Sequence, residues 1–159
     1  MGHPSETPRD HSGVVVPPPL IYALFFLVGA GLQRYLPLPR FPQVAGRILG
    51  AALALAWLVL TVSSFKSFWA SGTSVIPVRP TTALVIHGPY RFTRNPMYLS
   101  LLLLYVGLAC WFGWVWPLIL APGLVFVINA YVIGREERYL HHKFGQEYQR
   151  YQARVRRWM

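Results

Sequence analysis

Acidic residues are scarce in this sequence, which has 159 residues with 5 Asp and Glu against 15 Lys and Arg. No acid occurs between Asp10 and Glu136, so the whole middle of the chain lacks a carboxylate. Charged residues of both signs make up only 13% of the chain, whereas a soluble domain has about 25%. This deficit excludes an ordinary soluble domain and draws attention to the few carboxylates near the C-terminal end.

Cysteine is almost absent as well. The one cysteine, Cys110, lies in an apolar stretch, which excludes a disulfide framework or a cysteine-based metal site within one chain. His141 and His142 are neighbours, so on a helix their side chains point about 100° apart and cannot bind one metal ion side by side. We therefore predict no metal site and interpret Cys110 as a small buried residue.

Hydrophobic residues are abundant instead, at 54% of the chain, and they are clustered. A helix needs roughly 20 mostly apolar residues to cross about 30 Å of hydrocarbon. Several stretches have this character, which predicts an all-α integral membrane protein with about four transmembrane helices. The predicted spans are residues 19–35, 45–65, 96–112 and 116–133.

Two local patterns predict how these spans pack. Only the short segment Gly-Trp-Val-Trp separates the last two spans, so they should form a tight helical hairpin. The second span has small residues at four-residue spacing, which predicts a face on which another helix packs closely. These small residues are Gly46, Gly50 and Ala54.

The rest of the chain divides into three segments. Residues 1–15 are predicted to be a disordered tail before the first two helices, which occupy residues 16–65. Residues 66–95 are rich in Ser, Thr, Gly and Pro, which predicts an irregular cytoplasmic loop. Residues 135–153 predict a charged amphipathic helix that lies on the membrane or docks on the bundle. Its apolar stripe consists of Leu140, Phe144, Tyr148, Tyr151 and Val155.

The basic residues predict the orientation in the membrane. With four spans, Arg34, Arg40 and Arg47 lie on one side and the remaining 12 of the 15 lie on the side of the termini. Cytoplasmic loops are enriched in Lys and Arg, so we predict cytoplasmic termini in a multi-pass protein, in the plasma or inner membrane if the host is a prokaryote. Contact with anionic membrane lipids explains the net charge of +10 more simply than nucleic-acid binding, so no nucleic-acid partner is expected.

A dense polar stretch, residues 87–98, precedes the third span. Gly88 and Pro89 predict a turn, and Pro96 suits the first turn of a helix that Asn95 is placed to cap. A helix N-terminus with nearby arginines is also suited to anions. The further polar side chains at this helix start are Arg91, Arg94 and Tyr98.

A second polar cluster follows the fourth span. Glu136 and Glu137 come directly after apolar residues and are flanked by Arg135 and Arg138. They are open to two interpretations. One is a solvated helix end with weak local ion pairs, and the other is a site for a cationic or hydroxyl-bearing ligand.

Together the two clusters resemble the superfamily of isoprenylcysteine carboxyl methyltransferases and phospholipid methyltransferases. The shared pattern has an L-V-x-x-G-P-Y segment, then R-N-P-x-Y or R-H-P-x-Y, a helical hairpin, and E-E-x-x-L-x-x-x-F-G-x-x-Y-x-x-Y. This sequence has "LVIHGPY" from Leu84, "RNPMY" from Arg94 and "EERYLHHKFGQEYQRY" from Glu136. The resemblance covers residues 72–158, in the family's order.

The resemblance implies methyl transfer from S-adenosylmethionine inside the membrane, with residues 66–159 as the cofactor-binding catalytic region. The loop, the hairpin and the C-terminal segment would close the cofactor pocket. Its cofactor-binding residues would be His87, Gly88, Tyr90, Arg94, Asn95, Tyr98, Glu136 and Glu137. Its catalytic residues would be Arg94, Arg135, Asn95 and Tyr98, with an arginine holding a carboxylate or phosphate of the substrate.

The implied acceptor is lipophilic and enters from the bilayer: a small molecule, an isoprenyl-type carboxylate or a lipid headgroup. Asn95 stands where some members have histidine, and asparagine cannot act as a base near neutral pH. An ionised carboxylate needs no base, so this residue favours carboxyl O-methylation over N-methylation. Two alternatives are a nicotinamide-dependent membrane reductase of related fold and a non-enzymatic membrane scaffold. The oligomeric state is left open.

Overall fold

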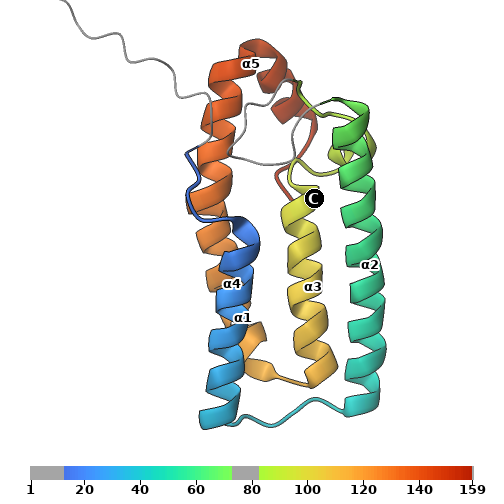
Figure 1. The fold of residues 1–159 in the computed structure, drawn as a ribbon, viewed down its shortest axis with the longest axis vertical. Coiled ribbons are helices and arrows are strands. Elements are labelled where there is room, and N and C mark those ends of the chain that lie inside the picture. The colour runs from blue at the N-terminus through green and yellow to red at the C-terminus, as the bar shows by residue number, and fades with distance from the viewer. Residues whose placement is uncertain (1–12, 73–82, 159) are drawn as a thin grey trace, which may run out of the picture.

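The computed structural model describes residues 13–72 and 83–158, in which every regular element is helical. Four long helices stand side by side, and the last helix folds over one end of the bundle (Figure 1). The predicted all-α fold is therefore confirmed. The elements are α1 (Pro18–Tyr35), α2 (Gln43–Ala70), the 3-10 helix η1 (Gly88–Arg91), α3 (Pro96–Phe112), α4 (Val115–Val127), the π-helical segment η2 (Ile128–Ile133) and α5 (Gly134–Arg154).

Two predicted segments fall partly outside these residues. Residues 1–12 of the predicted tail and residues 73–82 of the predicted loop lie outside the described part of the chain. Val14, which also belongs to the predicted tail, is 5% exposed and packs in the main apolar cluster. The chain is thus already packed against the bundle just before α1.

The α3–α4 hairpin and the α2–α3 contact have the predicted form. Gly113, with a φ of 68°, ends α3 in the left-handed conformation that glycine adopts readily, so α4 starts almost at once. A Cβ added to Gly50 would lie 2.7 Å from the carbonyl oxygen of Gly107, and one on Gly46 would lie 2.5 Å from that of Cys110. The small residues of α2 therefore let the two backbones approach closely.

Helix α2 continues to Ala70, further than the predicted span and into the predicted loop. The hydroxyl groups of Ser64, Ser67 and Ser71 each donate to a carbonyl oxygen four residues earlier, at 2.7, 3.0 and 2.9 Å. Serines that bond back to the helix in this way satisfy their own hydroxyl groups without leaving the helical path. The polar composition that predicted a loop is therefore compatible with another turn of helix.

From Val115 to Arg154 the chain forms one 40-residue helical stretch. At 1.5 Å per residue this is about 60 Å, twice the hydrocarbon thickness, so only the apolar part ending at Ile133 fits inside a membrane. The predicted single helix over 135–153 is wrong in one respect, because Gly145 has a φ of 48° and a ψ of −120° and kinks α5. The part after the kink turns back over the bundle end (Figure 1).

The predicted apolar stripe of this segment does pack, but across the kink. Tyr148, Tyr151 and Val155 are buried together, and Leu84, Leu140 and Phe144 pack against them. The kink at Gly145 brings the two halves of α5 together around one small apolar cluster. Leu84, from the segment just before η1, also packs in this cluster. The stripe therefore docks on the bundle rather than on a membrane surface.

Two helices, α2 and the stretch beginning at Val115, are long and apolar enough to cross a membrane, and α3 is a shorter apolar helix. Only 11% of the most apolar part of α2 is buried, whereas the core helix of a soluble protein would be mostly buried. The outward side chains of α1 and α2 are large and apolar. They include Leu20, Leu24, Leu27, Ile48, Leu55, Leu58 and Val59.

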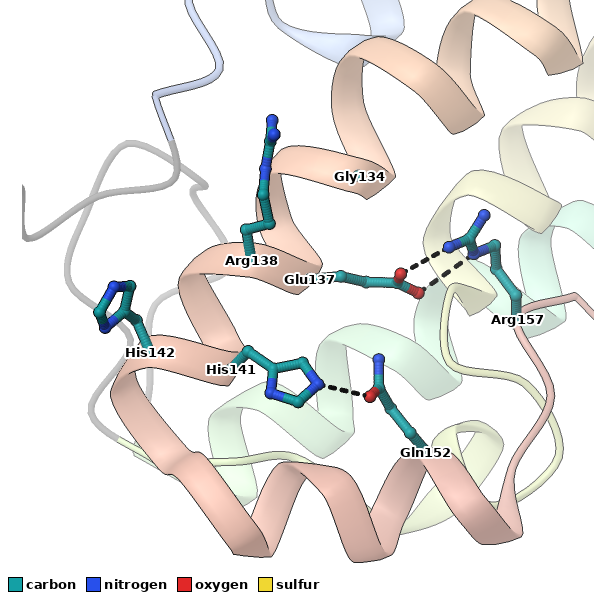
Figure 2. A pocket seen from close by; sticks show the side chains of 7 residues that line it. All are labelled: Gly134, Glu137, Arg138, His141, His142, Gln152 and Arg157. Carbon is teal, nitrogen blue, oxygen red and sulfur yellow. Dashed lines mark hydrogen bonds and ion pairs between the residues drawn. The ribbon is translucent and has the colours of Figure 1, made fainter.

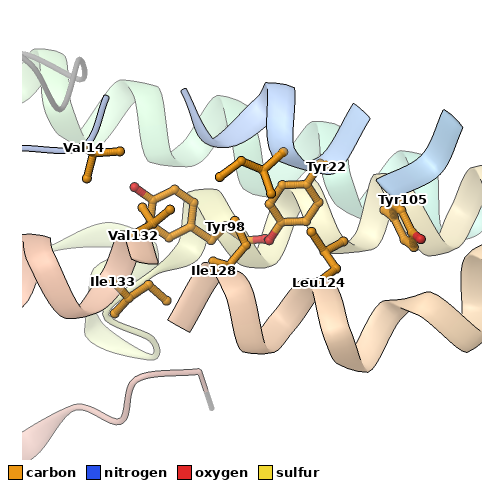
Figure 3. Packing of buried hydrophobic residues seen from close by; sticks show 9 residues of the cluster. Val14, Tyr22, Tyr98, Tyr105, Leu124, Ile128, Val132 and Ile133 are labelled. Carbon is orange, nitrogen blue, oxygen red and sulfur yellow. The ribbon is translucent and has the colours of Figure 1, made fainter. Parts of the chain in front are cut away.

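The main apolar cluster joins α1, α3, α4 and η2 (Figure 3). Three buried tyrosines, Tyr22, Tyr98 and Tyr105, belong to this cluster. The hydroxyl groups of Tyr22 and Tyr105 donate hydrogen bonds to backbone carbonyls. The hydroxyl of Tyr22 donates to the carbonyl of Tyr98 at 2.9 Å, and that of Tyr105 donates to the carbonyl of Pro117 at 2.7 Å. The first turn of α3 is thereby held against α1, and the middle of α3 is held against α4, which places the polar residues before α3.

Candidate functional site

The start of α3 is arranged differently from the predicted helix cap. Asn95 occupies the position before Pro96, but its side chain makes no capping hydrogen bond. Its amide group donates instead to the carbonyl of Arg157 at 3.0 Å, and the backbone N–H of Asn95 donates to the hydroxyl of Thr93 at 3.2 Å. The predicted cap is wrong because the C-terminal segment offers a carbonyl that the amide can reach.

That C-terminal segment runs beside α3 and holds several polar groups of the site. The backbone N–H of Arg94 donates to the carbonyl of Arg156 at 3.0 Å, and the hydroxyl of Thr93 donates to the carbonyl of Arg157 at 3.1 Å. The indole N–H of Trp158 donates to the side-chain oxygen of Asn129 at 3.1 Å. Asn129 lies in the π-helical segment, and such segments are frequent at functional sites.

Glu137 is the centre of an ion-pair network formed by three segments. Its Oε1 atom lies 3.0 Å from the Arg94 guanidinium, and Arg157 binds both of its oxygens, from Nε at 3.1 Å and from Nη2 at 2.6 Å (Figure 2). The Glu137 and Arg94 side chains are 15% and 13% exposed, and that of Arg157 is 40% exposed. The hydrogen bond to Glu137 raises the pKa of Arg157, so the Arg157 guanidinium stays ionised.

Glu136 faces a different direction from its neighbour. The hydroxyl of Tyr98 donates to Glu136 Oε1 at 2.5 Å. Glu136 lies just beyond the apolar segment that ends at Ile133, and burial raises its pKa from the ordinary 4.5 to about 7. The hydrogen bond from Tyr98 lowers this pKa, and the charge of Glu137 raises it. Adjacent helical positions point about 100° apart, so two neighbouring carboxylates serve two separate environments.

An open cavity of about 730 Å³ lies beside Glu137 and between the two halves of α5. This volume is within the range of about 300–1,000 Å³ that is usual for small-molecule sites. Across it, Glu137 meets Arg157, and His141 meets Gln152 with its Nε2 atom 2.9 Å from the amide oxygen (Figure 2). The lining residues are Gly134, Glu137, Arg138, His141, His142, Gln152 and Arg157.

The residues that line the cavity include two arginines, two histidines, a glutamine and one carboxylate, that of Glu137. Among the residues that the structure describes, no three His, Cys, Asp or Glu side chains are grouped as they would be around a metal ion. The wall therefore suits a ligand that has an anionic group together with hydroxyl or amino groups.

The structure separates the predicted site residues into two sets. Arg94, Asn95, Tyr98, Glu136 and Glu137 come together at the start of α3 and α5 through the contacts given above. The first predicted motif and the second therefore converge, although the α3–α4 hairpin lies between them in the sequence.

The other predicted residues lie around this set. His87 is exposed, with its Nε2 atom 3.5 Å from the Ser71 hydroxyl. Gly88, with a φ of 61°, approaches the side chain of Ser67 so closely that a Cβ would collide with it.

Tyr90 and Arg135 are both engaged in contacts away from Glu137. The Tyr90 carbonyl accepts a hydrogen bond from the Tyr151 hydroxyl at 2.7 Å, and its ring packs edge-on against Phe68. Arg135 donates to the carbonyl of Gly13 at 2.9 Å and lies over the ring of Tyr131. Arg135 thus holds the segment before α1 and does not line the cavity.

Of the residues that line the cavity, only Glu137 was predicted as a site residue, and the sequence reasoning missed the other six: Gly134, Arg138, His141, His142, Gln152 and Arg157. The two histidines were considered only as a metal pair, and Arg157 is one of several basic residues near the C-terminus with nothing local to distinguish it. Only the path of the chain past α3 identifies Arg157 as the partner of Glu137.

Comparisons with known proteins found a family and a relative that match this chain. Residues 45–147 match the family model described as phospholipid methyltransferase, and this range includes both glutamates and the start of α3. An uncharacterized protein of Haemophilus influenzae (strain ATCC 51907 / DSM 11121 / KW20 / Rd) is 46% identical over 67 residues, which are 40% of this chain and 100% of that protein. No solved structure matches the chain.

Proposed function

The chain belongs to the phospholipid methyltransferase family, and from this premise we propose that it is a membrane methyltransferase that uses S-adenosylmethionine. The observation that supports this most is the meeting of two distant motifs, at Glu137 with Arg94 and at Glu136 with Tyr98, next to an open cavity. The family match favours methyl transfer over a reductase or a scaffold.

The cofactor's charges fit the residues present. S-adenosylmethionine has a sulfonium and an ammonium cation, a carboxylate, and ribose hydroxyl groups. Glu137 receives three contacts from two arginines, and a carboxylate has about four lone-pair sites, so it keeps capacity for a hydroxyl or ammonium group. Arg138 is exposed at the cavity and Arg157 is partly exposed, so either can meet the cofactor's carboxylate.

The bound cofactor would supply an electrophilic methyl group, and the chain would supply its position. His141 and Gln152 hold one another across the cavity and would present donors and acceptors to the adenosine part. Trp158 holds the C-terminal segment against η2, and the Arg157 carbonyl holds it against Asn95 at the start of α3, which would exclude water from the reacting end. Positioning of this kind supplies much of the rate in a one-step displacement.

The acceptor would come from the lipid side. Tyr98 links the polar end of the site to the main apolar cluster, which can adjoin a lipid tail. We propose a lipophilic acceptor, either a lipid headgroup or a lipophilic carboxylate, with its tail in the bilayer. Membrane lipids would be direct partners, while nucleic acid is not expected.

We further propose that α1 to α4 all cross the membrane, with both termini in the cytoplasm. The loops at the site end and the C-terminal segment contain most of the Lys and Arg, and cytoplasmic loops are enriched in these residues. The two ends of the described chain lie beside the site, since Gly13 accepts a hydrogen bond from Arg135 and Arg157 accepts one from Asn95. The cavity would then open to the cytoplasmic pool of cofactor.

Calorimetric titration of the full chain in lipid–detergent micelles with S-adenosylmethionine tests the proposal. We expect saturable binding that weakens about 10- to 100-fold in Glu137→Gln, because a charged hydrogen-bonding group is lost. Glu147→Gln is the matched control, since Glu147 is exposed and outside the cavity. Circular dichroism checks that each variant is folded.

Glu137→Gln leaves two arginines unpaired, so a second variant is needed in case it does not fold. Arg138→Ala removes an exposed cavity cation that takes no part in the ion-pair network, and we expect about 3- to 10-fold weaker binding. Folded wild-type protein that does not bind the cofactor, with or without lipid, refutes the proposed function.

A further inference from the structure

Four exposed aromatic and basic side chains at the end of α2 and around η1 take no part in the candidate site. Trp69 of α2 is 77% exposed, and Lys66, one turn earlier, is exposed as well. Phe92, directly after η1, is also 77% exposed and follows the exposed Arg91. We call these four side chains the anchor residues.

The charges of α2 indicate how deep the anchor residues would lie in a membrane. Arg47 and Lys66 are the two charged residues of α2, and they are 19 positions apart. This spacing is about 29 Å along a helix, and the hydrocarbon layer is about 30 Å thick. Charged side chains avoid hydrocarbon, so Arg47 and Lys66 mark its two edges. Trp69 then lies about 5 Å beyond the edge, in the headgroup layer.

Contacts with the end of α2 hold η1 at the same depth. Gly88 lies so close to the Ser67 side chain that a Cβ on Gly88 would collide with it. The Tyr90 ring packs edge-on against Phe68, with 5.5 Å between the ring centres. The segment before α3 accordingly runs beside the end of α2 (Figure 1). Phe92, which directly follows η1, is therefore level with the last turns of α2.

The charge of this surface favours an anionic lipid layer over a protein contact between copies. No Asp or Glu occurs in the sequence between Asp10 and Glu136. Among residues 13–72 and 83–158, no ion pair joins Lys66 or Arg91 to a carboxylate. A second copy of the chain would bring the same cations to the contact, and like charges repel one another. Anionic headgroups complement the cations, and aromatic side chains are enriched at the membrane–water interface.

We propose that Trp69 and Phe92 insert among the headgroups of an anionic lipid layer, with Lys66 and Arg91 bound to lipid phosphates. This anchor holds η1, and with it the first polar motif, at the level of the headgroups. The partner is the lipid surface, which binds without reacting. The proposal requires that α2 crosses the membrane, and it does not depend on methyl transfer.

Fluorescence quenching by spin-labelled lipids measures the depth, with the full chain in vesicles of phosphatidylcholine and phosphatidylglycerol. Ala70→Cys in a Cys110→Ala background places a fluorophore at an exposed position next to Trp69 and keeps all four anchor residues. Glu147→Cys in the same background is the matched control, because Glu147 is exposed on the part of α5 that folds over the bundle end.

The two labelled positions should differ in a defined way. We expect a nitroxide on the lipid headgroup to quench the label at position 70 at least about threefold more strongly than the label at position 147. A nitroxide at the end of an acyl chain should quench both labels weakly, because neither position lies in the hydrocarbon layer.

A second measurement tests the two cations. Phosphatidylglycerol and phosphatidylcholine with a nitroxide at the same acyl carbon near the headgroup report which lipid surrounds position 70. We expect phosphatidylglycerol to quench about three- to tenfold more at low salt. In about 1 M salt the preference should disappear, because charges are screened within about 3 Å.

Paired substitutions identify the residues responsible for this preference. Lys66→Gln together with Arg91→Gln should abolish it. Arg40→Gln together with Arg47→Gln is the matched control and should leave it unchanged, since these arginines lie before and in the first turns of α2. All four side chains are exposed, and circular dichroism checks that each variant is folded.

Several outcomes overturn the proposal. They are equal quenching at positions 70 and 147 by the headgroup nitroxide, strong quenching at position 70 by the acyl-end nitroxide, and no preference for phosphatidylglycerol in the wild type. A preference that survives the loss of Lys66 and Arg91 also overturns it. None of these measurements uses S-adenosylmethionine, so a failure of the anchor is distinguishable from a failure of the proposed function.

Discussion

Replacing Glu136 with glutamine should make the protein more resistant to unfolding at alkaline pH. Burial raises the pKa of this carboxyl from the ordinary 4.5 to about 7, so the folded state holds the proton more tightly than the unfolded state. The stabilisation that the protonated Glu136 carboxyl gives the folded state is therefore complete below pH 4.5 and is lost as the pH rises through 7. Glutamine has no such ionisation and can still accept the Tyr98 hydrogen bond.

The magnitude follows from the size of the shift. Each pKa unit corresponds to about 1.4 kcal/mol, so the difference between 4.5 and 7 corresponds to about 3 kcal/mol in all. Most of this is lost between pH 5 and pH 8, which leaves roughly 2 kcal/mol to be measured. For a chain of this size, that is about 4–8 °C in Tm.

Thermal unfolding in one detergent, followed by tryptophan fluorescence, measures the effect at pH 5 and at pH 8. The Tm of the wild type should fall relative to that of Glu136→Gln as the pH rises. Glu147→Gln is the control, because Glu147 is exposed and should follow the wild type at both pH values. Equal changes in all three proteins would refute the assignment of a raised pKa to Glu136.

Two further variants test the packing and the C-terminal segment. Gly50→Val should destabilise the protein by about 1–3 kcal/mol, because the added Cβ would collide with the Gly107 carbonyl. Gly31→Ala is the control, since nothing lies within 4 Å of a Cβ at that position. Equal Tm values for the two variants would contradict the α2–α3 contact. Arg157→Lys should lower both Tm and cofactor affinity, because lysine cannot bind both oxygens of Glu137; an unchanged binding isotherm would remove Arg157 from the site.

The helices and the packing of α2 on α3 were predictable because they depend on near neighbours in the sequence. A run of apolar residues favours a helix wherever it lies, and small residues at Gly46 and Gly50 share one helix face. The same locality explains two errors. Ser67 looked like a loop residue but bonds within α2, and Gly145 looked like part of a continuous helix but kinks it.

The membership of the site was predictable only in part. The motifs named Arg94, Tyr98, Glu136 and Glu137 as a group, and the structure brings these residues together. They did not show which glutamate meets which partner, because the direction of a side chain depends on how α5 is turned against α3. The sequence resemblance assigned both glutamates to the cofactor, whereas their surroundings differ.

The sequence by itself determined that this chain forms apolar helices and contains two polar motifs. Both features depend on the composition and spacing of residues that are close together in the sequence. Only the tertiary structure decided that Tyr98 reaches Glu136 across 38 positions and that Asn95 reaches Arg157 across 62. Contacts over such separations depend on the packing of the whole bundle and on the kink at Gly145 that turns the C-terminal segment back. That packing gives Glu137 two arginine partners and Glu136 a tyrosine partner.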